Sequence, residues 1–239
     1  MVTEFRVFRY SPGRGNRWQE YRVETRAGAS VLEGLQTIRA DLDPTLAYRF
    51  ACRSSVCGSC AMLIDGQPRL ACQTRIQQLK GSCIVVAPLP GLPVIKDLVV
   101  DMEPFWTAYR RVMPWLVEKT GAKDMTITKA VSDVMEKFYS CILCAACFAA
   151  CPEAGGKHTY LGPMSLMEGY RLYLDPRDAA GEERRKILSG PDGVWGCHGA
   201  FACIDACPWD LAPVEFSAQL RLKLVGEKFS WLKKAFGQA

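Results

Sequence analysis

Apolar and polar residues alternate along the first part of the chain, a pattern typical of strands. The alternation runs through residues 4–10 and 18–24, and a segment rich in Gly and Pro separates the two runs. A half-buried strand presents every second side chain to the core. The pattern therefore predicts a β-hairpin over residues 3–25.

A helix is predicted directly after this hairpin. Ser30 and Glu33 have the spacing of a capping box, and apolar residues recur at helical spacing through residue 38. A second hairpin is expected over residues 61–72, because it contains an Asp-Gly pair, which favours a two-residue turn. A last strand is expected over residues 83–88.

From about residue 101 onward the spacing of apolar residues becomes helical. Strand-like alternation is absent from this part of the sequence. Helices are expected over residues 107–119, 127–139, 165–174, 182–188 and 217–236.

The composition is that of a globular protein with a sizeable core. Of 239 residues, 49% are hydrophobic and 23% are charged. No apolar run approaches the ~18 residues of a membrane span, and the N-terminus has no apolar signal segment. The sequence thus predicts an unexported chain with no transmembrane segment of its own.

The net charge of +5 is unevenly distributed. Residues 1–100 hold 13 Lys and Arg against 8 Asp and Glu. This bias suits an acidic partner surface or an anionic cofactor, and it equally suits a solvated surface without a partner. No basic stripe is present, so we expect no nucleic-acid partner.

The cysteines are the most informative residues of the sequence. The chain has 12 cysteines, and the cytosol keeps thiols reduced, so metal ligation is favoured over disulfides. Eleven of them fall into three groups with the spacing of iron–sulfur ligands. Such a chain is expected to carry single electrons, and no catalytic nucleophile–base arrangement is visible.

The first group has the C-x4-C-x2-C spacing of plant-type ferredoxins, with a fourth cysteine after eleven more residues. A zinc site would need a second C-x2-C pair, which does not follow. The group predicts a [2Fe–2S] cluster bound by Cys52, Cys57, Cys60 and Cys72.

The second group is the C-x2-C-x2-C-x3-C-P run of bacterial-type ferredoxins, and the third repeats it with one cysteine missing. In two-cluster ferredoxins the cysteine before Pro binds the cluster of the other run. This rule predicts a [4Fe–4S] cluster bound by Cys141, Cys144, Cys147 and Cys207.

The remaining cluster would be bound by Cys151, Cys197 and Cys203. A complete third run would have a cysteine at position 200, where the chain has Ala200. Alanine cannot bind iron, so this corner should be vacant and the cluster should be [3Fe–4S].

Together these patterns predict an α+β protein with two domains. Residues 1–100 would form a β-grasp domain of the plant-type ferredoxin kind. Residues 101–239 would form an all-α domain resembling bacterial ferredoxins and would carry the other two clusters.

The motifs resemble those of the iron–sulfur subunits of succinate dehydrogenases and quinol:fumarate reductases. The resemblance covers nearly the whole chain, and its signatures occur in the family's order in residues 53–74, 95–102, 141–152, 161–163, 173–178 and 197–208. It implies a membrane-bound enzyme whose FAD-containing flavoprotein subunit interconverts succinate and fumarate. It also implies a membrane anchor with a quinone site and often haem b. This chain would lie peripherally on the cytoplasmic side.

The resemblance also implies a quinone near the third cluster. The residues predicted in its vicinity are Pro152, His198, Trp195 and Trp209, of which His198 matches a quinone-site histidine of some members and the two tryptophans flank the third motif. Ubiquinone-reducing members have tryptophans where this chain has Gly155 and Gly156, which favours menaquinone. Hydrogen bonding around the cluster explains His198 equally well, and plain hydrophobic packing explains the two tryptophans.

Two other functions stay open at this point. The chain could serve another flavoprotein dehydrogenase or a thiol:fumarate reductase, although it lacks the Cys-Cys pairs of many such subunits. It could also be a soluble multi-cluster ferredoxin, although such carriers are usually acidic.

Overall fold

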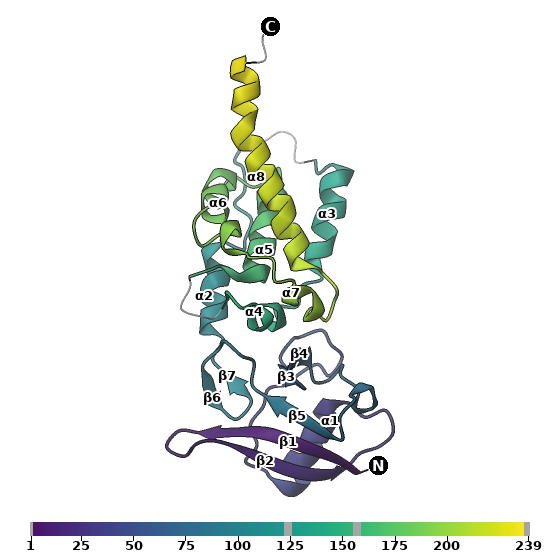
Figure 1. Cartoon of the computed structure of the whole chain (residues 1–239). Coiled ribbons are helices and arrows are strands. Elements are labelled where there is room, and N and C mark those ends of the chain that lie inside the picture. Colours follow the sequence, from purple (N-terminus) through teal and green to yellow (C-terminus); the bar gives the residue numbers. More distant parts are fainter. Residues whose placement is uncertain (1, 122–125, 155–158, 237–239) are drawn as a thin grey trace.

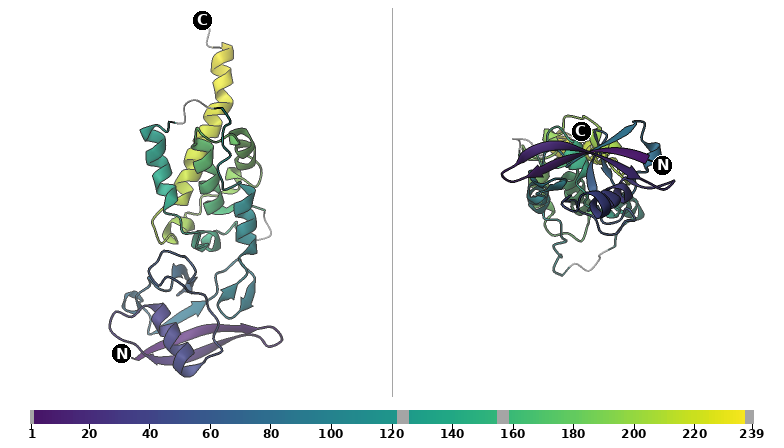
Figure 2. Two further views of the ribbon diagram at one scale, coloured as in Figure 1. Left: turned by 180° about the vertical axis from the view of Figure 1, so that it is seen from behind. Right: turned by 90° about the horizontal axis from the view of Figure 1, so that it is seen from below.

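The chain forms two lobes stacked along one long axis (Figure 1). The computed structural model describes residues 2–121, 126–154 and 159–236, with side chains described through residue 227. The β lobe contains strands β1 to β7 and helix α1, and the helical lobe contains α2 to α8. The view from behind in Figure 2 shows the same stacking, with the C-terminal helix projecting beyond the others.

The β lobe is built on a mixed sheet with the strand order β2-β1-β5-β3-β4. Its first strands form the predicted hairpin, in which Val2 lies opposite Glu24. The pairing between β1 and β5 is parallel, whereas β3 is antiparallel to both of its neighbours. The strands are β1 (Val2–Ser11), β2 (Gly15–Glu24), β3 (Ala61–Ile64), β4 (Gln67–Leu70) and β5 (Cys83–Ala87). The predicted α+β class and order of strands are confirmed.

Helix α1 (Val31–Thr37) begins at the predicted capping box. Ser30 Oγ accepts a hydrogen bond from the Glu33 N–H at 3.2 Å, and the Glu33 carboxylate accepts one from the Ser30 N–H at 2.8 Å. The helix packs closely against β1, because a Cβ atom at Gly34 would lie 2.3 Å from the ring of Phe5. A π-helical turn, Ile38–Leu42, extends it.

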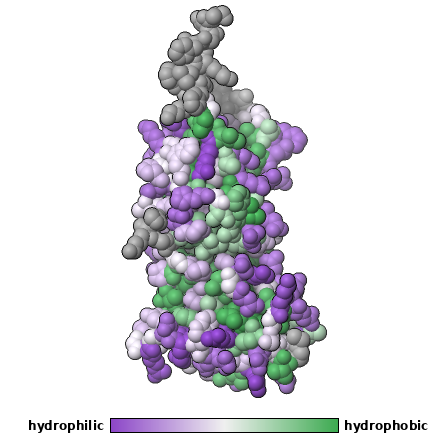
Figure 3. All heavy atoms as spheres, in the orientation of Figure 1, coloured by the Kyte–Doolittle hydropathy of each residue, from purple (hydrophilic) through white to green (hydrophobic). Residues whose placement is uncertain are grey.

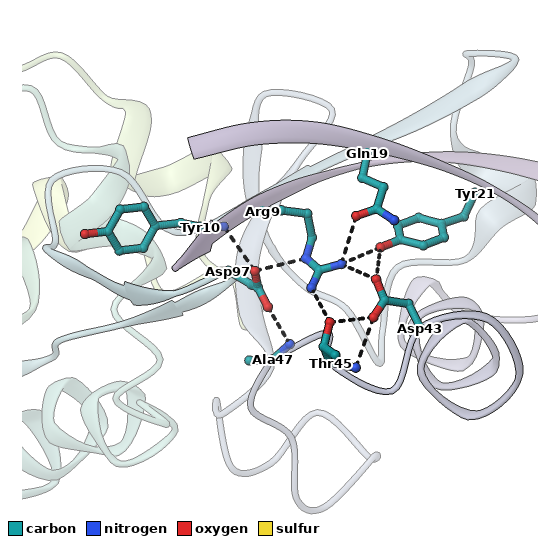
Figure 4. A network of polar contacts seen from close by, with 8 residues as sticks. All are labelled: Arg9, Tyr10, Gln19, Tyr21, Asp43, Thr45, Ala47 and Asp97. Atoms are coloured by element: carbon teal, nitrogen blue, oxygen red, sulfur yellow. Dashed lines mark hydrogen bonds and ion pairs between the residues drawn. The ribbon is translucent and has the colours of Figure 1, made fainter. Parts of the chain in front are cut away.

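A buried arginine ties the sheet to the segment that leads to the first cysteine (Figure 4). Arg9 on β1 is 3% exposed, and its guanidinium donates hydrogen bonds to Asp97 at 2.9 Å and to Asp43. It also donates to Thr45 at 2.8 Å and to Tyr21 at 2.6 Å. This network fixes the start of the chain segment that runs from α1 to the first thiol group.

A small second sheet carries Asp97. Strands β6 (Val94–Lys96) and β7 (Val99–Val100) flank it, and the sequence did not predict them. Asp97 also accepts hydrogen bonds from the backbone N–H groups of Tyr10 and Ala47. The carboxylate thus joins three segments that are far apart in the sequence.

The helical lobe surrounds α5, which is buried along nearly its whole length. Helices α2, α3, α6 and α8 pack against it. The helices are α2 (Glu103–Arg111), α3 (Lys129–Tyr139), α4 (Ala146–Ala150), α5 (Gly162–Leu174), α6 (Gly181–Leu188), α7 (Ala202–Asp205) and α8 (Pro213–Phe236), and short 3₁₀ turns lie at Ile76–Gln78 and Val194–Gly196.

The helix expected over residues 107–119 is wrong in its second half. Helix α2 ends at Arg111, three residues before Pro114, which cannot continue a helix. The buried side chain of Arg184 instead holds the next segment in an irregular path. It donates to the Trp115 carbonyl at 2.6 Å and pairs with the buried Asp178 at 2.7 Å.

Each lobe has its own hydrophobic core. Leu89, Leu92 and Val100 nevertheless pack in the core of the helical lobe. The two lobes therefore share packing on the N-terminal side of residue 100, and the domain boundary there stays a prediction. Figure 3 shows hydrophobic and hydrophilic residues mixed over the visible face of both lobes. Among the described residues, no helix is both long and apolar enough to cross a membrane.

Candidate iron–sulfur sites

Cys52, Cys57 and Cys60 of the first thiol group lie on a largely exposed loop whose Gly58 abuts Cys144 of the helical lobe, and Cys72 lies two residues after β4. Backbone N–H groups of Ser54, Val56 and Cys57 approach the Cys52 sulfur at 3.3–3.4 Å. These donors, with that of Ser54 first, lower the pKa of Cys52 to about 6. The loop thus already favours an anionic sulfur ligand.

The other thiols of this group converge on the same loop. The Cys52 N–H points at the Cys57 sulfur at 3.4 Å, and Ser55 Oγ lies 3.8 Å from the Cys72 sulfur. Cys60 is buried, and burial raises its pKa to about 12, with further contributions from Cys72 and Cys57. The structure therefore brings together all four predicted ligands of the first cluster.

The second thiol group lines a cavity in the helical lobe, called the second cavity here. Burial, followed by neighbouring thiols, raises the pKa of the partly exposed Cys147 well above its usual value. The cysteines that line this cavity are Cys141, Cys144, Cys147 and Cys207. Cys207, which precedes Pro208, therefore lies with the cysteines of the second group, although in the sequence it belongs to the third group.

The third thiol group lines another cavity of the helical lobe, called the third cavity here. Its cysteines are Cys151, Cys197 and Cys203, and Ala200 and Phe201 also line it. Burial raises the pKa of Cys203 to about 11, and the nearby thiols of Cys151 and Cys197 add to the shift. These three cysteines are the ones predicted to share a cluster.

The second and third cavities are bounded by equivalent backbone turns. Helix α4 follows Ala145, which has a φ of 62°, and helix α7 follows Phe201, which has a φ of 60°. Cys144 immediately precedes the first of these residues, and Ala200 immediately precedes the second. Ala200 therefore occupies the place in the third cavity that a cysteine occupies in the second.

The three thiol groups have features that suit iron–sulfur clusters. In a cluster the thiolates bind different iron atoms and surround a shared volume. Thiol-lined cavities with backbone N–H groups aimed at sulfur fit iron–sulfur centres.

The residues predicted near a quinone separate in the structure. Pro152 and His198 line the third cavity, and the exposed His198 imidazole lies 3.0 Å from the Glu153 carboxylate. Trp195 is 47% exposed and stacks under Arg221. Gly155 and Gly156 lie outside the described residues.

Trp209 is placed elsewhere. It lines the second cavity, and its indole N–H donates to the Ser55 carbonyl of the β lobe at 3.2 Å. The prediction that it borders a quinone stays a prediction.

Several site residues were not found from the sequence. Arg221 on α8 donates to the carbonyls of Val194, at 2.8 Å, and Cys197. Tyr160 lines the third cavity, where burial raises its pKa. No local motif marks these residues, because they reach the cysteines only through the packing of the helices.

Comparison with known families agrees with this geometry. The family described as "2Fe-2S iron-sulfur cluster binding domain" matches residues 4–107. The family described as "4Fe-4S dicluster domain" matches residues 134–208. The chain thus combines two iron–sulfur binding domains.

Two similar proteins are described as succinate dehydrogenase iron-sulfur subunits, and a chain of one solved complex has a similar fold. The succinate dehydrogenase iron-sulfur subunit of Paracoccus denitrificans is 36% identical over 230 residues, covering 94% of this chain and 88% of that protein. The mitochondrial succinate dehydrogenase [ubiquinone] iron-sulfur subunit 2 of Oryza sativa subsp. japonica is 40% identical, covering 95% and 76%. A chain of the Mycobacterium smegmatis Sdh1 complex in the apo form superposes with a TM-score of 0.87 at 25% identity, covering 96% and 98%.

Proposed function

Since this chain belongs to the family of succinate dehydrogenase iron–sulfur subunits, we propose that it passes electrons between a flavoprotein subunit and a quinone at a membrane anchor. The observation that carries the proposal is the arrangement of the thiols. Eleven cysteines gather into three groups, one in the β lobe and two in the helical lobe. Dicarboxylate chemistry would then take place on the partner that holds FAD.

The ligand sets of the proposal follow the three groups. Cys52, Cys57, Cys60 and Cys72 would hold a [2Fe–2S] cluster, and Cys141, Cys144, Cys147 and Cys207 would hold a [4Fe–4S] cluster. Cys151, Cys197 and Cys203 would hold a [3Fe–4S] cluster, because Ala200 stands where a fourth cysteine would be needed. The matching turns before α4 and α7 support this last assignment.

Backbone and side-chain groups of the chain would adjust the reduction potentials of these centres. When bound, iron–sulfur clusters supply one-electron oxidation and reduction. The N–H groups around Cys52 stabilise negative charge on its sulfur. Arg221 places a positive charge beside the loop of Cys197.

The quinone end of the path is assigned to the third cavity. Pro152 and His198 line it, and Trp195 lies beside Arg221, so these three residues carry the quinone proposal. The Glu153 carboxylate lies within hydrogen-bonding distance of the His198 imidazole. The proposed quinone is menaquinone, because Gly155 and Gly156 stand where ubiquinone-reducing members have tryptophans.

The proposed partners are an FAD-containing flavoprotein and a membrane anchor, which in many such enzymes holds haem b. The chain would bind to the membrane peripherally through the anchor, on its cytoplasmic side. The names of the similar proteins support the dehydrogenase, and the thiol cavities support the electron path.

Low-temperature EPR of the purified complex tests the proposal. We expect a [3Fe–4S] signal in the oxidised sample, and [2Fe–2S] and [4Fe–4S] signals after reduction with dithionite. Two [4Fe–4S] signals and no [3Fe–4S] signal would contradict the vacant corner at Ala200. Absence of any cluster signal would contradict the electron-transfer function itself.

A further inference from the structure

The two lobes meet where their thiol-bearing loops lie side by side. Gly58 directly follows Cys57, and a Cβ atom placed on it would lie 2.8 Å from both Cα and Cβ of Cys144. Even a methyl group would not fit there, so the backbone beside one thiol touches a thiol-bearing residue of the other lobe.

A hydrogen bond spans the same junction. Trp209 follows Cys207 by two residues and lines the second cavity, and its Nε1–H donates to the Ser55 carbonyl at 3.2 Å. Ser55 lies on the first thiol loop, between Cys52 and Cys57. The bond therefore joins the wall of the second cavity to the loop that carries the first thiol group.

We propose that Trp209 is a positioning residue for electron transfer between the first two centres. Its indole N–H holds the first thiol loop against the second cavity, at the close approach that Gly58 permits. This inference rests on the proposed function, because it requires a centre at each thiol group.

The step that depends on this contact is simple. One centre loses one electron as the other gains it, and no proton moves and no bond forms or breaks. The contact can therefore affect this step only through the separation and orientation of the two centres. Indole nitrogen is a donor only, so its pairing with a carbonyl fixes the orientation of the ring.

The test compares Trp209→Phe with Trp18→Phe in the assembled complex. Phenylalanine keeps an aromatic ring but has no N–H to donate. Trp18 is a matched control, because it is 43% exposed against 45% for Trp209 and lies on β2. Hydrogen exchange is measured in peptides covering residues 52–60 and 141–147. EPR of the fully reduced complex measures the magnetic interaction between the two centres.

For Trp209→Phe we expect exchange about 2- to 10-fold faster at both peptides, the range for one lost neutral hydrogen bond. We also expect a weaker magnetic interaction, which a purely structural role elsewhere in the lobe would not change. Trp18→Phe should leave both measurements as in the wild type. Equal results for the two variants would overturn the inference.

The spectra separate this inference from the proposed function. If both centres show their own signals and the interaction is unchanged in Trp209→Phe, only the inference fails. If the wild-type complex lacks either centre, the proposed function fails and the inference with it. Should Trp209→Phe not assemble, Gly58→Ala probes the same contact. An unchanged interaction there would refute the inference, and a weaker one with intact individual signals would support it.

Discussion

Loss of the Arg9 guanidinium should destabilise the β lobe by about 3 kcal/mol. Removing one partner of a buried ion pair costs about 3–5 kcal/mol, because the remaining charge stays buried without compensation. Arg9 is 3% exposed and Asp97 is 2% exposed, so Arg9→Gln meets this condition. We expect the lower end of the range, because Asp97 keeps two backbone donors and Asp43 keeps those of Thr45.

Urea unfolding of the cluster-loaded chain, followed by circular dichroism at a fixed incubation time, measures this loss. With a slope of about 2 kcal/mol per molar urea, the midpoint should fall by about 1.5 M. Arg22→Gln is the matched control, since Arg22 pairs with Glu4 at the same 2.9 Å but with 80% and 46% of the two side chains exposed. Exposed pairs contribute about 0–1 kcal/mol, so its midpoint should fall by less than about 0.5 M. Equal shifts for Arg9→Gln and Arg22→Gln would refute the reasoning.

Further predictions concern the vacant corner, acid stability, helix packing and the third centre. Ala200→Cys should convert the third centre to [4Fe–4S], so the [3Fe–4S] EPR signal of the oxidised complex should disappear; its persistence would argue against equivalence with Cys144. Burial alone would raise the pKa of Asp43, but hydrogen bonds from its neighbours hold it well below its usual value. Its contribution should thus be fully present above about pH 4 and be lost progressively as the pH falls below it, so urea midpoints measured from pH 6 to 3 should stay level down to about pH 4 and then fall. Gly34→Ala should destabilise by about 1–3 kcal/mol, since its Cβ would lie 2.3 Å from the Phe5 ring, and an unchanged thermal midpoint would show that the ring moves freely. Arg221→Gln should lower the midpoint potential of the third centre while Arg221→Lys restores it, as measured by EPR redox titration, because a nearby cation favours the reduced, more negative cluster.

Local signals in the sequence determined much of the fold. The capping box of α1, the Asp-Gly turn between β3 and β4 and the alternation in β1 and β2 act between residues close in sequence. For such elements the physical cause is contained in a short segment, so the pattern is sufficient. The spacing of the cysteines carried equally specific information, because a ligand set constrains residue type as well as distance along the chain.

Where local signals competed with tertiary contacts, the sequence was insufficient. Residues 112–119 have helical spacing, but Pro114 and the buried Arg184 hold them in an irregular path. The small sheet of β6 and β7 was missed because its strands are only two or three residues long. The formation of such short strands depends on contacts with residues distant in the sequence, which a local pattern does not predict.

The sequence by itself determined which residues have the chemistry to bind iron, and the rule for two-cluster ferredoxins predicted which of them meet. The tertiary structure brings them together, because Cys207 lines the second cavity and Cys151 the third where α4 and α7 pack against each other. It also decided the contact between the lobes, since Trp209 and Ser55 are separated by 154 residues. Burial, charge pairing and close approach arise when residues far apart in the sequence pack together. The pattern of residues along the chain does not specify these contacts.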